Sequence, residues 1–259
     1  MPDKLTIVKI GGNVIDEPEQ LKSFLLDFAN LPGLKILVHG GGKLATGFSK
    51  RLGLEPRLVD GRRITSDADL EVAVMVYAGL INKSIVARLQ ASGCNALGLS
   101  GADGNSIVSQ KRPVGEIDFG WVGDVKQVHA RNIRLLLEAG FTPVFCALTH
   151  DGQGQMLNTN ADTIAAELAI GLSGNFETEL LYCFEKKGVL RDVEDADSVI
   201  STIDSASYAR LKTEGVIHQG MLPKMENCFR ALQGGVRKVL IGHPGLLANP
   251  QDVHTRLRL

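Results

Sequence analysis

Short apolar runs alternate with segments of helical periodicity near the N-terminus. Residues 5–10 and 34–38 are apolar and rich in β-branched side chains, which predicts two buried strands. Apolar residues recur at helical spacing over residues 21–28, and a second helical pattern follows over residues 43–52. Because this β-α-β-α order favours parallel strands, the pattern predicts an α/β fold with ligands at the carboxyl ends of the strands.

The middle of the chain predicts one long helix followed by short strands. Ser66 is placed to cap a helix over about residues 67–91, and Gly93 is placed to end it. Residues 95–98 then predict a short strand. Over residues 106–128, short alternating pieces are separated by Pro and Gly, which predicts antiparallel hairpins at the margin of the sheet.

The remaining pattern predicts a second α/β lobe. A helix over residues 132–139, a buried strand over 142–147 and a helix over 161–172 precede a boundary near residues 171–177. Beyond this boundary we expect further strands and helices at residues 179–183, 205–213, 224–233 and 238–241. The sequence therefore predicts two lobes, residues 1–173 and 174–259.

Composition narrows the class of protein. The chain has 259 residues, 44% of them hydrophobic, and a net charge of −1, with a pI near 6.6 and a mean hydropathy of +0.06. No Lys/Arg-rich stretch is interleaved with aromatic residues, so we expect a small-molecule partner rather than nucleic acid. We expect a cytoplasmic protein without signal peptide or membrane span, whose four cysteines are buried thiols.

Glycines follow both N-terminal strands, as Gly11-Gly12 and Gly40-Gly41-Gly42. Each run separates an apolar strand from a helical pattern, where unpaired backbone N–H groups can face an anion. Neither run is a Walker A loop, because Lys43 is followed by Leu44, and neither forms the G-x-G-x-x-G dinucleotide fingerprint. The glycines indicate a phosphate site of another kind.

Seven motifs occur in one order along nearly the whole chain. They are Lys9-Ile10-Gly11-Gly12, His39-Gly40-Gly41-Gly42, Gly61-Arg62-Arg63-Ile64-Thr65, Gly79-x-x-Asn82-Lys83, Gly98-Leu99-Ser100-Gly101-Ala102-Asp103-Gly104, Asn158-Thr159-Asn160-Ala161-Asp162 and Gly220-Met221-x-x-Lys224. In these motifs the chain resembles the amino acid kinase family and, within it, the acetylglutamate kinases. The resemblance implies a three-layer αβα sandwich with a mainly parallel central sheet, in which residues 1–173 bind N-acylglutamate and residues 174–259 bind ATP.

The resemblance also implies a reaction. The γ-phosphoryl group of ATP passes to the side-chain carboxylate of an N-acylated glutamate, the second step of arginine biosynthesis. A carboxylate with a pKa near ~4.3 is already ionised at neutral pH, so it needs no general base. The site must instead reduce the repulsion between two anions.

Three residues match the catalytic positions of the family. Lys9 and Lys224 are implied to supply positive charge along the path of the phosphoryl group. Asp162 is implied to bridge the two lysines and to hold their orientation. From its position alone, Asp162 could equally be a helix cap.

Two further sets of residues match the phosphoryl and substrate positions. Gly11, Gly12, Gly41 and Gly42 are implied to offer backbone N–H groups to the phosphoryl group in transfer, with Gly11 and Gly12 at the ATP phosphates and Gly41 and Gly42 beside the substrate. Arg63 has a planar fork that can grip the α-carboxylate with two hydrogen bonds, and Asn158 can donate to a carboxylate or acyl oxygen.

The nucleotide site departs from the family pattern. Where acetylglutamate kinases carry a Thr/Ser-Asp-Val-x-Gly stretch, residues 181–190 place Glu185 at the position of the Asp. The expected ATP-binding residues are Glu185, Gly188, Gly220 and Met221, together with Gly11 and Gly12. We expect no metal ligands from the protein, since Mg²⁺ would be held mainly by the nucleotide phosphates and water.

Several alternatives stay open at this stage. The acyl group can be acetyl or succinyl, and the additional carboxylate of a succinyl group would need a cation such as Arg62, Lys111 or Arg112. A glutamate, aspartate, carbamate or UMP kinase of the same superfamily is the nearest rival, and the Arg63 and Asn158 motifs argue against it. A catalytically silent amino-acid sensor of the same fold is another alternative, favoured only by the altered segment around Glu185. Since only residues 1–4 precede the first strand, we expect an arginine-insensitive homodimer whose interface uses the helix over residues 67–91.

Overall fold

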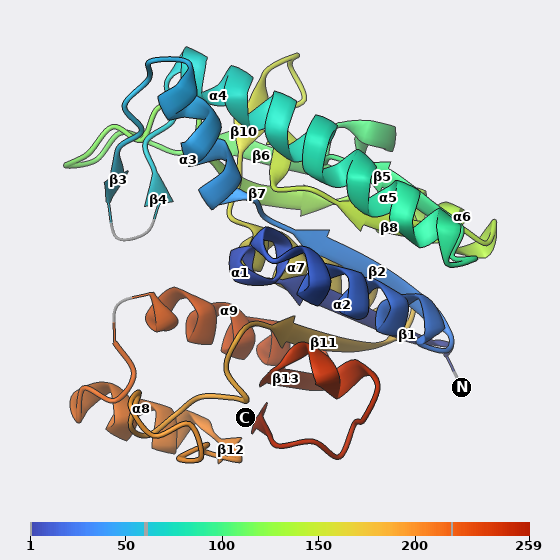
Figure 1. The fold of residues 1–259 in the computed structure, drawn as a ribbon, viewed down its shortest axis with the longest axis vertical. Helices are drawn as coiled ribbons and strands as arrows, with labels where there is room; N and C mark the ends of the chain where they lie inside the picture. Colours follow the sequence, from blue (N-terminus) through green and yellow to red (C-terminus); the bar gives the residue numbers. More distant parts are fainter. Residues whose placement is uncertain (1, 60–61, 219) are drawn as a thin grey trace.

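An eight-stranded sheet forms the centre of the protein (Figure 1). The computed structural model describes residues 2–59, 62–218 and 220–259, so Gly61 of the third motif lies outside the described residues. The strands lie in the order β12 (Thr202–Ile203), β14 (His254–Leu257), β13 (Lys238–Gly242), β11 (Glu177–Cys183), β1 (Lys4–Ile10), β2 (Leu34–His39), β8 (Thr142–Phe145) and β5 (Ala96–Leu99). Neighbouring strands are parallel except β13 and β14. The predicted mainly parallel sheet is confirmed.

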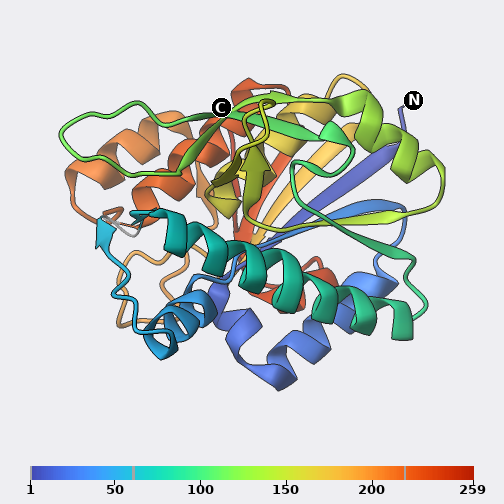
Figure 2. The same ribbon diagram turned by 90° about the horizontal axis from the view of Figure 1, so that it is seen from above.

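Helices cover both faces of this sheet, which gives the predicted three layers (Figure 2). On one face lie α1 (Gly12–Asp16), α2 (Pro18–Asn30), α3 (Gly42–Arg51) and the long helix made of α4 (Asp67–Ala73), η1 (Val74–Ile81) and α5 (Asn82–Ala91). The other face carries α6 (Ala130–Glu138), α7 (Ala161–Leu172) and α9 (Met221–Gln233), with α8 (Ser205–Thr213) beside α9. Two single-turn 3₁₀ segments are η2 (Asp103–Asn105) and η3 (Pro244–Leu247).

Side-chain caps explain where several helices begin. Ser66 accepts from the Asp69 backbone N–H, and the Asp69 carboxylate accepts from the Ser66 N–H, so the predicted cap is a complete capping box. Asn160 accepts from the N–H groups of Asp162 and Thr163 at the start of α7. These caps satisfy N–H groups that the helix itself leaves unpaired.

A four-stranded sheet borders the main sheet. Its order is β10 (Met156–Asn158), β9 (Leu148–His150), β6 (Ile107–Lys111) and β7 (Gly123–Val128), and a small pair, β3 (Leu58–Val59) and β4 (Arg62–Arg63), lies nearby. β6 and β7 are antiparallel, which confirms the predicted hairpin, whereas β9 and β10 were not predicted. The β9–β10 hairpin carries Asn158 to the carboxyl ends of the main strands.

The predicted boundary between lobes falls within one continuous sheet. β11 follows the boundary and pairs along its whole length with β1, from Lys4 opposite Glu177 to Ile10 opposite Cys183. The division into residues 1–173 and 174–259 therefore concerns ligand binding rather than separate sheets, and it stays a prediction.

The long helix is the one described helix whose length and composition would suffice to cross a membrane. It spans Asp67–Ala91. In this fold it packs against α2, α3 and the strand β5, as a helix of a layered core does.

Candidate active site

A cavity of about 780 Å³ lies at the carboxyl ends of β1 and β2. Ligand sites of parallel α/β sheets occur at this edge. Ten of the predicted site residues line it: Lys9, Gly11, Gly12, Gly41, Gly42, Arg63, Asn158, Asp162, Glu185 and Lys224. The fold thus brings residues from both halves of the chain to one site.

Lys9 and Lys224 meet at the carboxylate of Asp162. Lys9 Nζ lies 2.7 Å from Asp162 Oδ1, and Lys224 Nζ lies 2.8 Å from Oδ2. Each oxygen of one carboxylate therefore holds one ammonium group. Lys9 stands near the end of β1, Asp162 in the first turn of α7, and Lys224 in the first turn of α9. Parallel pairing of β1 with β11 brings the two halves together here.

The electrostatics of this cluster are mutually dependent. Burial lowers the pKa of Lys9, the Asp162 carboxylate opposes that change, and the second ammonium adds to it. Burial raises the pKa of Asp162, but the charges and hydrogen bonds of Lys9 and Lys224 together hold it well below its ordinary value. The carboxylate is therefore ionised at neutral pH, and the cluster of three side chains is net positive.

Lys224 also contacts two aromatic rings. Its Nζ lies 5.2 Å from the ring centroid of Tyr182 and 6.0 Å from that of Phe184. The Tyr182 hydroxyl in turn donates to the backbone carbonyl of Asp162 at 2.9 Å. The rings restrict the position of this ammonium group through cation–π contacts.

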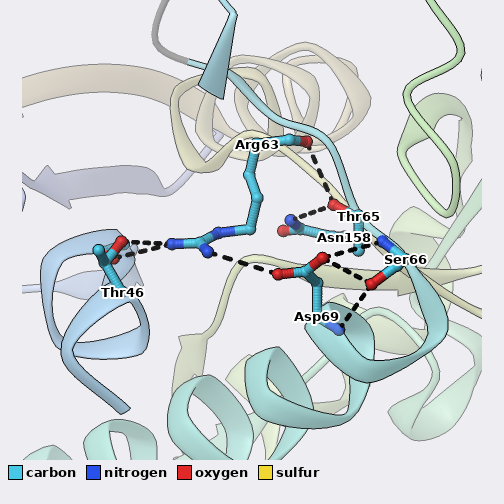
Figure 3. A network of polar contacts seen from close by, with 7 residues as sticks. Thr46, Arg63, Thr65, Ser66, Asp69 and Asn158 are labelled. Atoms are coloured by element: carbon cyan, nitrogen blue, oxygen red, sulfur yellow. Dashed lines mark hydrogen bonds and ion pairs between the residues drawn. The ribbon is translucent and has the colours of Figure 1, made fainter. Parts of the chain in front are cut away.

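Arg63 is a buried cation that lines the same cavity, and its polar contacts are drawn in Figure 3. Its Nη2 donates to the Thr46 hydroxyl at 2.5 Å and to the Gly42 carbonyl at 3.2 Å, and its Nη1 lies 3.7 Å from Asp69 Oδ1. These contacts tie β4 to the start of α3 and to the capping box of α4. They hold the guanidinium in place without using all of its donors.

Asn158 is linked to Arg63 by hydrogen bonds to the Thr65 hydroxyl. Its Nδ2 donates to the Thr65 hydroxyl at 3.0 Å, and that hydroxyl donates to the Arg63 carbonyl at 3.2 Å (Figure 3). Thr65 is fully buried. It links the two predicted substrate residues, although its side chain had no expected role beyond membership of a motif.

The glycine runs differ in what their amides can do. The Gly11 N–H donates to the Cys183 carbonyl at 2.9 Å, so it is engaged inside the protein rather than free to face a phosphate. Gly12 and Gly42 begin α1 and α3, where the helix provides no acceptor for the first N–H groups. Gly41 precedes α3, and an added Cβ would overlap Ile81 Cδ1 and lie 3.1 Å from Tyr77 Cδ1.

The predicted nucleotide residues are dispersed. Glu185 is exposed at the cavity, whereas Gly188, Gly220 and Met221 are not among the described residues that line it. Gly188 is instead tightly packed inside the protein, because a Cβ added there would lie only 2.7 Å from Thr255 Oγ1. Gly220 and Met221 form the entry to α9, which positions Lys224.

Tyr77 and Asp124 line the cavity without an expected role, whereas Arg112 was expected only as a possible cation for a succinyl group. Tyr77 is buried behind Gly41, and burial raises the pKa of its hydroxyl while the nearby Arg63 opposes the shift. Arg112, just after β6, and Asp124, on β7, form an ion pair at 2.5 Å. They also line a second cavity of about 380 Å³, next to the first. Sequence spacing offered no signal for Tyr77, because its helix is apolar on all sides.

Comparison with known proteins places these features in a family. Residues 4–243 match the amino acid kinase family. A protein named acetylglutamate kinase from Cytophaga hutchinsonii is 60% identical over 239 residues, which cover 92% of this chain and 90% of that protein. A protein of the same name from Bacteroides fragilis is 54% identical over 241 residues, covering 93% and 92%. The crystal structure of smu.665 from Streptococcus mutans has a TM-score of 0.76 at 26% identity, covering 92% and 94%.

Proposed function

This chain belongs to the amino acid kinase family, and from that membership we propose that it phosphorylates the side-chain carboxylate of N-acetyl-L-glutamate with ATP. Its relatives named acetylglutamate kinase share more than half of its residues over most of its length. The family predicted from the seven motifs is thereby confirmed, and the chain is an enzyme of amino-acid biosynthesis. The reaction corresponds to the second step of arginine synthesis.

The observation that carries the proposal is the Lys9–Asp162–Lys224 cluster, which lines one cavity together with Arg63. We propose that Arg63 and Asn158 bind the substrate, so that its side-chain carboxylate points toward the two ammonium groups. Lys9 and Lys224 then stabilise the negative charge on the transferring phosphoryl group, while Asp162 keeps them apart and oriented. A catalytically silent sensor would not need two ammonium groups held on one carboxylate.

ATP binding is proposed for the part of the cavity formed by the end of β11 and the start of α9. Glu185 and Phe184 line this part, next to Lys224. Asp162 is held by two ammonium groups and Asp124 by Arg112, so we propose that Mg²⁺ is coordinated mainly by the nucleotide phosphates. The ion would supply charge neutralisation on those phosphates.

Succinyl in place of acetyl is the second candidate. Arg62 and Arg112 line both cavities and could face an additional carboxylate, although Arg112 is already paired with Asp124. An ADP-release assay with N-acetyl-L-glutamate, N-succinyl-L-glutamate and free L-glutamate, with hydroxylamine to trap the acyl phosphate, decides between them. Turnover of neither acyl form, with ligand still bound, would favour the sensor. Addition of L-arginine tests the expected insensitivity.

A homodimer in the cytoplasm is proposed with the long helix at its interface. Val74, Met75 and Leu80 project apolar side chains from this helix and are 36%, 56% and 48% exposed. Burial of such a surface against a second copy would remove it from water. Light scattering should give twice the chain mass, and Met75→Glu with Leu80→Glu should give the monomer.

A further inference from the structure

A buried histidine and a buried asparagine lie behind the glycine run that borders the cavity. His39 is the last residue of β2 and is fully buried, and Asn82 is the first residue of α5 and is 1% exposed. Asn82 Nδ2 lies 3.0 Å from His39 Nε2. Neither residue is among the described residues that line the cavity. Any effect of these two residues on the reaction must therefore be transmitted through the backbone of the glycine run that borders the cavity.

The contacts of Asn82 fix the tautomer of His39. Asn82 Nδ2 also donates to the Val144 carbonyl at 2.9 Å, whereas its Oδ1 accepts from Lys83 Nζ at 3.2 Å. A flipped amide would set two oxygen atoms against each other at Val144, so Nδ2 is the atom that faces the ring. His39 Nε2 therefore accepts a hydrogen bond, and the ring proton lies on Nδ1.

His39 Nδ1 donates this proton to the Gly40 carbonyl at 2.8 Å. Because a trans peptide is planar, the Gly40 carbonyl and the Gly41 N–H point in opposite directions. When the ring holds the carbonyl on the buried side, the Gly41 N–H faces away from that side, and Gly41 lines the cavity. Glycine at this position has enough backbone freedom for the peptide to turn over if the ring did not hold it.

We propose that His39 and Asn82 are positioning residues that hold the Gly40–Gly41 peptide so that its N–H points to the phosphoryl group in transfer. The inference rests on the proposed kinase reaction and on the expectation from the sequence that Gly41 offers its backbone N–H to the transferring group. Burial lowers the pKa of His39 to about 4, opposed by the hydrogen bond to Gly40 and reinforced by Lys83. The ring is then neutral at physiological pH, with one donor and one acceptor, as the two contacts require.

Two substitutions of His39 distinguish the role of Nδ1 from that of Nε2. In His39→Asn the amide NH₂ takes the place of Nδ1 and keeps the donor to Gly40, whereas in His39→Gln the amide reaches the place of Nε2 and loses it. We expect His39→Gln to lower kcat about 100-fold at nearly constant KM, and His39→Asn to recover most of the loss. Equal losses in the two variants, or a rise in KM at constant kcat, would contradict the inference.

A measurement on the unaltered protein does not depend on how the variants fold. Nitrogen-15 NMR of labelled histidine should show the Nδ1–H tautomer for His39, without titration between about pH 7 and 5. The Nε2–H tautomer, or protonation near its ordinary pKa, would overturn the inference. Failure of the proposed function would appear differently, as absence of turnover by the unaltered protein.

Discussion

Lys9 Nζ lies 2.7 Å from Oδ1 of Asp162, at the point where the main strand β1 meets the N-terminus of α7. This ion pair uses one of the three N–H bonds of the ammonium group, which leaves the others for an incoming anion. Asp162 binds Lys224 through its second oxygen. The one negative charge of Asp162 offsets only one of the two positive charges. The cluster therefore keeps an attraction for phosphate that a simple ion pair would lose.

Replacement of Lys9 by Met should abolish most of the activity. The side chain keeps its apolar length but loses the charge on the phosphoryl path, so we expect kcat to fall at least about 100-fold with little change in substrate KM. Lys4→Met is the matched control on the same strand, because Lys4 pairs with Glu179 at the surface. Steady-state kinetics of both variants test the role, and less than a tenfold loss in Lys9→Met would refute it.

Asp162→Asn should cost stability as well as activity. The substitution leaves two buried ammonium groups without a counter-charge, and loss of one partner of a buried ion pair costs about 3 kcal/mol or more. Because the pKa of Asp162 is lowered on folding, this stabilisation is present above its ordinary value of 3.8 and is lost as the pH falls further. Urea unfolding at neutral pH measures the difference. Asp197→Asn, which removes an exposed ion pair with Lys187, should leave the unfolding midpoint unchanged.

Much of the fold could be predicted because local signals agree with it. α7 was predicted as residues 161–172 and is found as Ala161–Leu172, since Asn160 supplies a cap and the apolar positions follow the helical period. β1 and β2 are buried strands whose sequences are mostly apolar. The cavity could be foreseen from the glycines after these strands, and the lysine–aspartate cluster from the family motifs.

Other parts leave no local signal. β12 has two residues and depends on pairing with β14, which sequence periodicity cannot show. The π-helical turns of η1 lie in a segment that is apolar on all sides, so no period separates them from an α-helix. The Arg112–Asp124 pair joins the residue after β6 to β7, and a hairpin prediction without the strand register does not show which side chains meet. For β12 the determining contact is distant in sequence.

Arg63→Lys should weaken substrate binding more than catalysis. Lysine keeps the charge but cannot form the planar pair of hydrogen bonds with a carboxylate, so KM for the acylglutamate should rise about 10-fold or more. Thr46→Val removes one support of the guanidinium and leaves the guanidinium itself. If Thr46→Val raised KM as much as Arg63→Lys, the arginine would act mainly by bracing the loop; a clearly smaller effect supports direct binding.

His39 should make the fold sensitive to mild acid. Its pKa is about 4 in the folded protein and 6.5 ordinarily, so the unfolded chain binds the proton first and stability falls as the pH drops from 6.5 toward 4. Between about pH 7 and pH 5 the shift corresponds to a loss of about 2 kcal/mol. Urea unfolding of the unaltered protein and of His39→Asn at the two pH values isolates this contribution. The same loss in both proteins would exclude His39 as its source.

Gly41→Ala should disrupt the site where Gly47→Ala does not. A methyl group at Gly41 overlaps Ile81 Cδ1, approaches the Tyr77 ring at 3.1 Å and meets a positive φ, so the loop must shift away from the π-helical segment. We expect a loss of about 1–3 kcal/mol in the free energy of unfolding and also a loss in kcat, because the amide beside the phosphoryl group moves with the loop.

Gly47 is the matched control. It lies within α3 with no heavy atom within 4 Å of an added Cβ, so alanine there should be neutral or stabilise the fold by up to about 1 kcal/mol. Thermal unfolding and kinetics of the two variants make the comparison. Unchanged kcat in Gly41→Ala would mean that the contact between η1 and the glycine run has no part in positioning the site.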